Sequence, residues 1–193
     1  MGYYRKNFRR RNEGLICHNC KLCTHKIIMR ILFLDIDGVI STRSCWGRGK
    51  NNKWDAYMFD PKCVAVLNYI LIATGAEIIL SSDWRHHYTL QEIREIFCHN
   101  GVIKGPIGFT PSLPTNAMDL EGGRSNEIKL WLKIHAWKED LKWVAVDDMN
   151  MHEQFDEQGE VITGLKNFVH CPNDQAGIKG HGVKDKILEF LNG

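Results

Sequence analysis

The sequence predicts a three-layer, Rossmann-like α/β fold with a mainly parallel central sheet and only short flap inserts. Apolar strand-like segments alternate along the chain with segments of helical periodicity, and this alternation favours parallel strands covered by helices on both faces. Three of the strand-like segments end in polar side chains, namely Asp35, Ser81 and Asp147. Because the carboxyl ends of parallel strands lie along one edge of a sheet, we expect these side chains to meet there.

The first predicted elements are a strand, a flap and a helix. The strand runs from Arg30 to Asp35, and the polar segment 41–60 that follows shows no sustained periodicity, so we interpret it as a flap. Pro61 stands at the favoured first turn of a helix, and Gly75 should end that helix.

The remaining elements repeat the alternation. After the strand AEIILS, Thr89 and Glu92 form the capping-box pattern of a helix that ends near His99. Residues 100–123 are rich in glycine, proline and turn residues, which predicts an irregular loop that forms a small lid. Ser125 should cap the next helix. The last predicted elements are the strands KWVAVDD and KNFVHC and the helix VKDKILEFLN.

Composition indicates one domain with an appendage. The chain has 193 residues, 44% of them hydrophobic, which is enough for a single substantial core. We expect the domain to occupy residues 29–193. Residues 1–28 form a basic, cysteine-rich extension that the domain does not need, and a disordered state is one alternative for it.

Charge is distributed unevenly between these two parts. Residues 1–30 carry eight Lys or Arg against one Glu, whereas the rest of the chain carries 17 basic and 22 acidic residues. Arginines alternate with Tyr3, Tyr4 and Phe8 in the extension, a mixture that suits nucleic acid as well as it suits a solvated tail.

The seven cysteines indicate reduced thiols rather than a disulfide framework. No apolar run reaches membrane-spanning length and the N-terminus lacks the apolar stretch of a signal peptide, so we expect a cytoplasmic location and no membrane contact. The segment CHNCKLCTH offers residue types that bind zinc. Its ligands crowd together without a second pair, so zinc binding is the less favoured interpretation.

The segment RILFLDIDGVI places Asp35 and Asp37 two residues apart at the end of the first strand. Alternation along a strand would project both carboxylates to one side, where they repel each other unless a proton or a cation lies between them. Oxygen ligands from acidic side chains suit Mg²⁺, so the segment predicts a magnesium site. Gly38 fits a sharp turn beside a ligand.

Three further groups are expected at the same edge of the sheet. Asp147 and Asp148 form a second acidic pair at the end of the strand KWVAVDD, which strengthens the prediction of a divalent cation. Ser81 and Ser82 offer hydroxyls that can hold a phosphoryl oxygen. Lys129, in the helix before that strand, can offset negative charge beside the acids.

Taken together, the motifs LFLDIDGVI, IILSS, EIKLWL and VAVDD resemble those of the haloacid dehalogenase (HAD) phosphohydrolase superfamily. Within it, the spacing and the small inserts are similar to the phosphatase domain of phage polynucleotide kinase-phosphatase and to HAD domains of RNA repair proteins. The resemblance spans residues 30–148. The third motif departs from the family pattern because Arg124 is available as well as Lys129.

The resemblance implies a role for each matched position. Asp35 would be the nucleophile that forms an aspartyl-phosphate, and Asp37 would be the general acid and then the general base. Ser81 and Lys129 would stabilise the phosphoryl oxygens. The Mg²⁺ ligands would be Asp35, the Asp37 carbonyl group, Asp147 and Asp148.

The substrate is predicted from the short inserts, which leave the site open for a large molecule. Basic and aromatic residues are interleaved in the flap and after the second strand, a pattern that can follow a nucleic-acid strand. The leading hypothesis is therefore a phosphatase for nucleic-acid or nucleotide phosphate ends, such as a 3′-phosphate. The candidate substrate-binding residues are Trp46, Arg48, Ser82, Arg85 and Arg124.

Two alternatives stay open at this point. A small phosphate monoester or a mononucleotide could be the substrate of the same chemistry. A nucleic-acid-binding protein with a vestigial HAD site is the alternative from another class, although the intact set of acids argues against it. The oligomeric state is left open.

Overall fold

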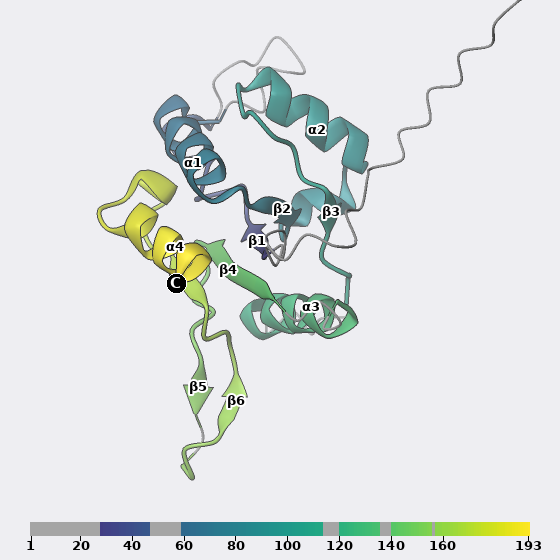
Figure 1. Cartoon of the computed structure of the whole chain (residues 1–193), viewed down its shortest axis with the longest axis vertical. Helices are drawn as coiled ribbons and strands as arrows, with labels where there is room; N and C mark the ends of the chain where they lie inside the picture. The colour runs from purple at the N-terminus through teal and green to yellow at the C-terminus, as the bar shows by residue number, and fades with distance from the viewer. Residues whose placement is uncertain (1–27, 47–58, 114–119, 136–139, 156) are drawn as a thin grey trace, which may run out of the picture.

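The computed structural model describes residues 28–46, 59–113, 120–135, 140–155 and 157–193. A five-stranded sheet with the order β3-β2-β1-β4-β7 lies at its centre, and each pair of neighbouring strands in it is parallel. Helices cover both faces, which confirms the predicted α/β class (Figure 1). In chain order the elements, with η for 3₁₀ helices, are β1 (Met29–Leu34), α1 (Pro61–Thr74), β2 (Glu77–Leu80), η2 (Asp83–His86), α2 (Leu90–His99), β3 (Gly108–Phe109), α3 (Leu120–Ile134), β4 (Leu141–Asp147), β5 (Gln154–Phe155), β6 (Val161–Thr163), β7 (Phe168–His170), η3 (Gly177–Lys179) and α4 (Val183–Asn192).

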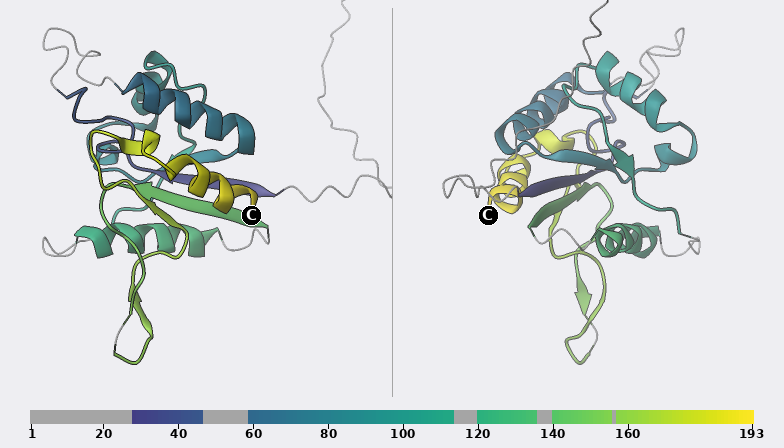
Figure 2. Two further views of the ribbon diagram at one scale, coloured as in Figure 1. Left: turned by 90° about the vertical axis from the view of Figure 1, so that its left-hand side faces the viewer. Right: turned by 45° about the vertical axis from the view of Figure 1, so that its right-hand side comes forward.

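Alternation along β1 divides the core into two layers. Leu32 and Leu34 point to the face of the sheet that α1, α2 and α4 cover, and they pack with residues of these helices. Ile31 and Phe33 point to the opposite face and pack with Ile128 and Trp131 of α3. The left view of Figure 2 shows α3 on one side of the sheet and α1 and α4 on the other.

The register of the sheet aligns the residues that follow the strands. Leu34 pairs with Leu80 of β2 and with Val146 of β4. The residue directly after β1 is Asp35, whose backbone N–H donates to the Val146 carbonyl (3.1 Å), and the N–H of Ser81 donates to the Leu34 carbonyl (2.9 Å). The carboxyl edge of the sheet therefore places the predicted site residues in adjacent strands.

Local signals at the helix ends are confirmed. Pro61 begins α1, and Gly75 ends it in the left-handed conformation with φ 67°, which glycine adopts without a Cβ penalty. Thr89 and Glu92 make the reciprocal bonds of a capping box at the start of α2. These interactions depend on neighbouring residues alone, so the sequence pattern is sufficient to identify them.

The segment 100–123 is more regular than its composition predicts. It contains β3, which extends the sheet because the N–H of Ile107 and the N–H of Thr110 donate to carbonyl groups of the β2 region. Helix α3 begins at Leu120, so Ser125 lies inside the helix and the predicted cap at that residue is wrong. Pairing with β2 is a long-range interaction that local composition does not encode.

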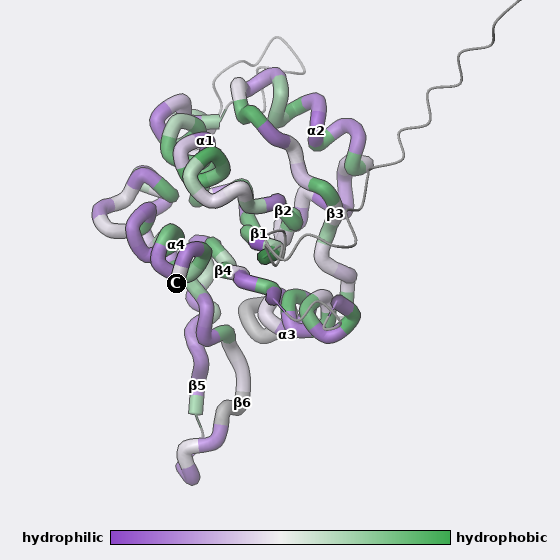
Figure 3. The backbone as a smooth tube through the Cα atoms, in the orientation of Figure 1, coloured by the Kyte–Doolittle hydropathy of each residue, from purple (hydrophilic) through white to green (hydrophobic). Residues whose placement is uncertain are grey.

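A β-hairpin that the sequence did not predict leaves the body of the molecule after β4. It consists of β5 and β6, which pair antiparallel. Figure 3 shows that hydrophilic residues dominate its tip, where Glu157 and Glu160 are exposed. None of the described side chains of β5 and β6 belongs to either core cluster.

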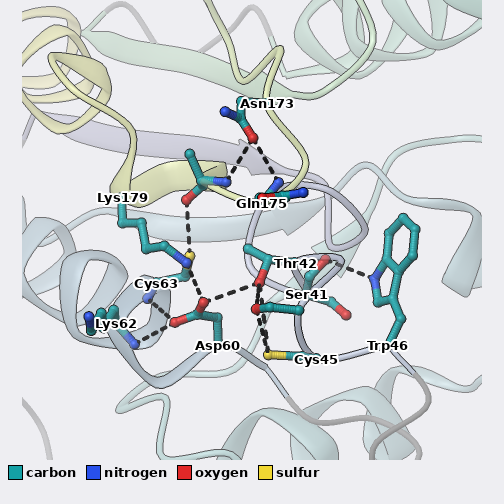
Figure 4. Close-up of polar contacts among 12 residues, drawn as sticks. Ser41, Thr42, Cys45, Trp46, Asp60, Lys62, Cys63, Asn173, Gln175 and Lys179 are labelled. Atoms are coloured by element: carbon teal, nitrogen blue, oxygen red, sulfur yellow. Dashed lines mark hydrogen bonds and ion pairs between the residues drawn. The ribbon is translucent and has the colours of Figure 1, made fainter.

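A polar cluster centred on Asp60 connects the base of the flap to the loop before α4 (Figure 4). The carboxylate caps α1 by accepting from the N–H groups of Lys62 (2.8 Å) and Cys63 (3.3 Å). It also accepts from the Thr42 hydroxyl (3.1 Å) and forms an ion pair with Lys179 of η3. One buried acid thus fixes two segments that border the carboxyl edge of the sheet.

Within the described residues, every helix is too short or too polar to cross a lipid bilayer. The longest, α3, has 15 residues. This finding concerns only the part of the chain that the structure describes.

The Asp60 cluster leads to a stability prediction. Asp60→Ala should lower the free energy of unfolding by about 2 kcal/mol, because it removes a helix cap and leaves Lys179 and Thr42 without their acceptor. Urea denaturation at neutral pH measures this change. The matched control is Asp174→Ala, which removes an exposed ion pair with Arg43 and should cost less than about 0.5 kcal/mol.

The pH dependence of the Asp60 effect has a defined sign. Burial acts to raise the pKa of Asp60, but the bonds from Lys179 and the α1 backbone hold this pKa below its ordinary value. The stabilising contribution is therefore complete above about pH 4 and is lost as the pH falls through the lower, folded-state pKa. An Asp60→Ala effect that stayed constant down to that pH would contradict the assigned charge.

Candidate active site at the carboxyl edge of the sheet

Five residues form a row along the carboxyl edge, one at the end of each strand of the main sheet or directly after it. The pairings Leu80 with Phe109 and Asp147 with His170 extend the register across all five strands. Asp35 and Asp147 are only 3% and 1% exposed. The row lies on the α3 side because it continues the alternation of Ile31 and Phe33. Its members, in sheet order, are Thr110, Ser81, Asp35, Asp147 and His170.

Three carboxylates of this edge converge on a small volume. Asp35, Asp147 and Asp148 each offer one oxygen, and these atoms lie within 4.8 Å of one another. Burial raises the pKa of Asp35 well above its ordinary value, and the charge of Asp147 raises it further. Burial likewise raises the pKa of Asp147, to about 6. The ionised forms thus need nearby positive charge.

The donor set fits a magnesium ion. All three ligand atoms are carboxylate oxygens, the hard ligands that Mg²⁺ prefers, and a divalent cation would offset the repulsion among them. The side chain of Asp37 is not part of this oxygen cluster.

Among the residues that the structure describes, Arg124 of α3 is the cation that contacts Asp35 and Asp147 directly. One guanidinium nitrogen lies 2.9 Å from Asp147 Oδ2 and 3.3 Å from Asp35 Oδ1, and the other terminal nitrogen lies 3.1 Å from Asp83 Oδ1. Burial alone would lower the pKa of Arg124, but the carboxylates of Asp35 and Asp147 raise it, so the side chain stays charged. This cation partly compensates the buried acids.

Lys129 lies on a different side of α3 from Arg124. The two residues are five positions apart, which corresponds to about 140° around the helix axis. Lys129 is half-buried, and among the described residues no hydrogen bond or ion pair involves its amino group. The structure therefore brings Arg124, and not Lys129, to the acids.

Gly38 allows the turn after β1 to approach the acidic cluster. Its φ is +69°, and a Cβ atom built on it would lie 2.2 Å from Asp148 Oδ2. Both the backbone conformation and the contact exclude a side chain here. The turn predicted from the sequence therefore serves to bring backbone against a metal-ligating candidate.

Asp37 lies at the exposed mouth of the site. Trp84 of η2 donates an Nε1–H hydrogen bond to Asp37 Oδ2, with a length of 2.7 Å. Partial burial raises the pKa of Asp37, the Trp84 bond opposes the shift, and the charge of Asp148 adds to it. An acid with a raised pKa that faces solvent is suited to proton transfer.

The two serines after β2 differ in their contacts. The hydroxyl of Ser81 is buried and has no hydrogen-bond partner among the described residues. The hydroxyl of Ser82 donates to the Asp35 carboxylate. The Ser81 hydroxyl is thus unpaired among the described residues, whereas the Ser82 hydroxyl acts to lower the pKa of Asp35.

A buried ion pair beside the row joins η2 to α3. Arg85 Nη2 lies 2.5 Å from Glu127 Oε2, and these side chains are 6% and 3% exposed. The other oxygen of Glu127 accepts from the N–H of Leu113 (2.9 Å), so the loop after β3 is held as well. Arg85 also donates to the Ser82 carbonyl (3.2 Å). Sequence analysis missed Glu127 because its only sequence signal is its position one turn after Arg124.

The other predicted binding residues are placed differently. Trp46 is 49% exposed, and its Nε1–H donates to the Ser41 carbonyl (3.2 Å). Arg48 lies outside the described residues, as do the rest of the flap over 47–58 and the N-terminal segment 1–27 with its cysteine cluster. The proposed domain boundary at residue 29 stays a prediction, although β1 begins there.

The fold and the site together define the HAD-like class of phosphohydrolases, in which acids at the carboxyl edge of a parallel sheet face a buried cation. Residues 31–173 match the family described as the HAD domain in Swiss Army Knife RNA repair proteins, and the chain belongs to this family. Membership supports a phosphatase of the HAD type and confirms the resemblance seen in the motifs. Comparisons with curated proteins and with solved structures gave no significant match.

The contrast between Arg124 and Lys129 gives a direct test. Arg124→Gln should lower kcat/KM for phosphate release by roughly 10²-fold or more, since it removes the charge that contacts two buried acids. Lys129→Gln is the matched control on the same helix and should change kcat/KM less than about threefold. A larger loss for Lys129→Gln than for Arg124→Gln would assign the third motif to the lysine.

Proposed function

We propose that the protein is a Mg²⁺-dependent phosphatase that removes a phosphate from the end of a nucleic-acid strand or nucleotide, such as a 3′-phosphate, through an aspartyl-phosphate on Asp35. The observation that carries the proposal is the convergence of Asp35, the residue directly after β1, with two further carboxylates and Arg124. The family description, which refers to RNA repair proteins, supports a nucleic-acid end as the substrate.

Asp35 is suited to act as the nucleophile because it is held in one orientation. Ser82 donates to its carboxylate, and Arg124 lies 3.3 Å from Oδ1. Attack by a carboxylate oxygen forms the Asp35–phosphorus bond while the bond from phosphorus to the leaving oxygen breaks. The free hydroxyl of Ser81 can donate to a phosphoryl oxygen as negative charge accumulates there.

Asp37 is suited to transfer the protons. In the first step it donates a proton to the leaving oxygen, and in the second it accepts a proton from the water that attacks phosphorus and releases Asp35. Trp84 fixes the carboxylate through the 2.7 Å bond to Oδ2. Such a position at the mouth gives both the leaving group and water access to one carboxyl group.

The metal would be held by Asp35, Asp147 and Asp148, with the carbonyl group of Asp37 as the further ligand that the motif implies. When bound, Mg²⁺ supplies positive charge that offsets the charge of the transferring phosphoryl group. Contact of the N-terminal arm with nucleic acid and a cytoplasmic location stay predictions.

The nucleophile assignment is tested with Asp35→Asn. This nearly isosteric change should lower kcat by roughly 10³-fold or more while the circular dichroism spectrum is retained, because an amide does not form the acyl-phosphate. Phosphate release should be screened over 3′- and 5′-phosphorylated oligonucleotides, mononucleotides and sugar phosphates. Turnover near that of the wild type would refute the mechanism, and preference for a sugar phosphate would refute the substrate class.

The metal assignment is tested by removing and restoring Mg²⁺. Exhaustive EDTA treatment should abolish phosphate release, and added Mg²⁺ should restore it. Mg²⁺ should also raise the melting temperature of the wild type, because binding to the folded state alone stabilises it, by about 2.7 kcal/mol at a concentration of 100 Kd. The increase should be much smaller in Asp147→Asn. Full activity in EDTA would contradict the assignment.

A further inference from the structure

A cavity of about 350 Å³ lies between β7, η3 and the start of α4, and we call it the β7–α4 cavity. The basic residues His170, His181 and Lys186 line it, and within the part of the chain that the structure describes no Asp or Glu does so. A concave site whose charged residues are all basic attracts an anion.

The charges of this cavity differ from those of a cavity of about 250 Å³ between η2 and α3, the η2–α3 cavity. Arg85 and Arg124 line the η2–α3 cavity, but each is paired with an acid that also lines it, Glu127 and Asp83 respectively. By contrast, the amino group of Lys186 has no hydrogen bond or ion pair among the described residues. The positive charge of the β7–α4 cavity is therefore not neutralised by a contacting acid.

The basic residues of β7 and α4 lie near one another. The rings of His152 and His170 are 6.4 Å apart. Burial lowers the pKa of His152, and the charges of His170 and Lys186 lower it further. A third group beside the cavity thus experiences the positive potential of two residues that line it.

The backbone at the start of α4 adds hydrogen-bond donors to this positive charge. Gly180 and Gly182 line the cavity and have no side chain to cover the backbone there, and α4 begins after Gly182 without a side-chain cap. The first N–H groups of a helix have no partner within the helix, and the helix dipole favours negative charge beside them. These donors strengthen the attraction that the basic residues create.

The β7–α4 cavity borders the candidate active site at two points. His170 donates an Nε2–H hydrogen bond to the backbone carbonyl of Asp148, with a length of 2.9 Å. Gly177 also lines the cavity, and the N–H of the residue after it, Ile178, donates to the carbonyl of Val39 (2.9 Å) in the turn that follows β1. The walls of the cavity are thus bonded to the segments that carry the acids.

The sheet sets the distance between the cavity and the candidate nucleophile. Asp35, Asp147 and His170 occupy matching positions in three neighbouring strands. Neighbouring strands lie about 4.8 Å apart, so Asp35 and His170 are separated by about 10 Å. A stacked nucleic-acid strand advances about 3.4 Å per nucleotide. A few nucleotides therefore span this distance.

We infer that the β7–α4 cavity binds a phosphodiester group of the nucleic-acid strand whose terminal phosphate reacts at Asp35. The inference rests on the proposed function and narrows its substrate to the end of an oligonucleotide. Lys186 supplies positive charge, and His181 and the backbone at the start of α4 supply N–H donors to the phosphodiester oxygens. A mononucleotide has no group that fills this cavity while its phosphate is at Asp35.

The test moves one neutral linkage along a strand. The probes are short oligonucleotides with a 3′-phosphate in which a methylphosphonate replaces each phosphodiester in turn. In the wild type, kcat/KM should fall roughly tenfold when the neutral linkage is the one that the cavity binds, the value of one charge-assisted hydrogen bond. A small loss that is the same at every position would overturn the inference.

Lys186→Gln tests whether the sensitive linkage lies in the β7–α4 cavity. The loss at that position should shrink to about twofold or less, because the neutral linkage then removes a contact that is already absent. Lys184→Gln is the matched control on the same helix, since Lys184 is not among the residues that line the cavity and lies 3.6 Å from exposed Asp185. It should leave the tenfold loss in place. Equal losses in the wild type and in Lys186→Gln would overturn the inference.

Binding to Asp35→Asn separates this inference from the proposed function. Fluorescence anisotropy with the same probes needs no turnover and should show the same sensitive linkage. Adding Lys186→Gln should also reduce the slope of log Kd against log salt concentration by about 0.7, the value of one phosphate contact on a single strand. An unchanged slope in a protein that releases phosphate would overturn the cavity assignment and leave the phosphatase chemistry standing. A reduced slope without any turnover would support the cavity assignment and refute the proposed function.

Discussion

Electrostatic repulsion among buried carboxylates is the constraint on which the architecture of the edge depends. Asp35 and Asp147 are almost fully enclosed, and Asp148 lies beside them. Burial disfavours the charged form of each, so folding must place positive charge at the same point. Arg124 supplies part of it from α3, with contacts of 2.9 Å and 3.3 Å to two of the acids. The acidic oxygens that remain uncompensated are suited to hold a divalent cation.

The same electrostatic constraint also restricts the backbone around this edge of the sheet. Parallel pairing of β1 with β2 and β4 determines which residues become neighbours, and a shift by one residue would turn the acids away from α3. Gly38 must lack a side chain because Asp148 occupies the space where its Cβ would lie. The ion pair between Asp60 and Lys179 joins the start of α1 to η3, two segments that border this edge. Each feature is local, but together they keep the acids in one geometry.

The sequence was sufficient wherever one short segment determined the outcome. The α/β class, the limits of α1, the capping box of α2 and the range of α4 follow from patterns within a few residues. The sequence was insufficient where contacts between distant segments determine the structure. Strand β3 exists because it pairs with β2, and Thr110 joins the row only through that pairing. The choice between Arg124 and Lys129 depends on which side of α3 packs on the sheet, which the motif alone left open.

The buried Arg85–Glu127 ion pair is explained by the segments that it holds in place, and not by a gain in stability. Removing two charges from water costs several kcal/mol per ion, and well-packed apolar residues often replace such a pair without loss of stability. The pair therefore contributes mainly by what it holds: Arg85 contacts the Ser82 carbonyl, and Glu127 accepts from Leu113. Ser82 in turn orients the nucleophile candidate Asp35. One ion pair thus joins two residues that line the η2–α3 cavity to the backbone of Ser82 and Leu113, the segments that follow β2 and β3 at this edge.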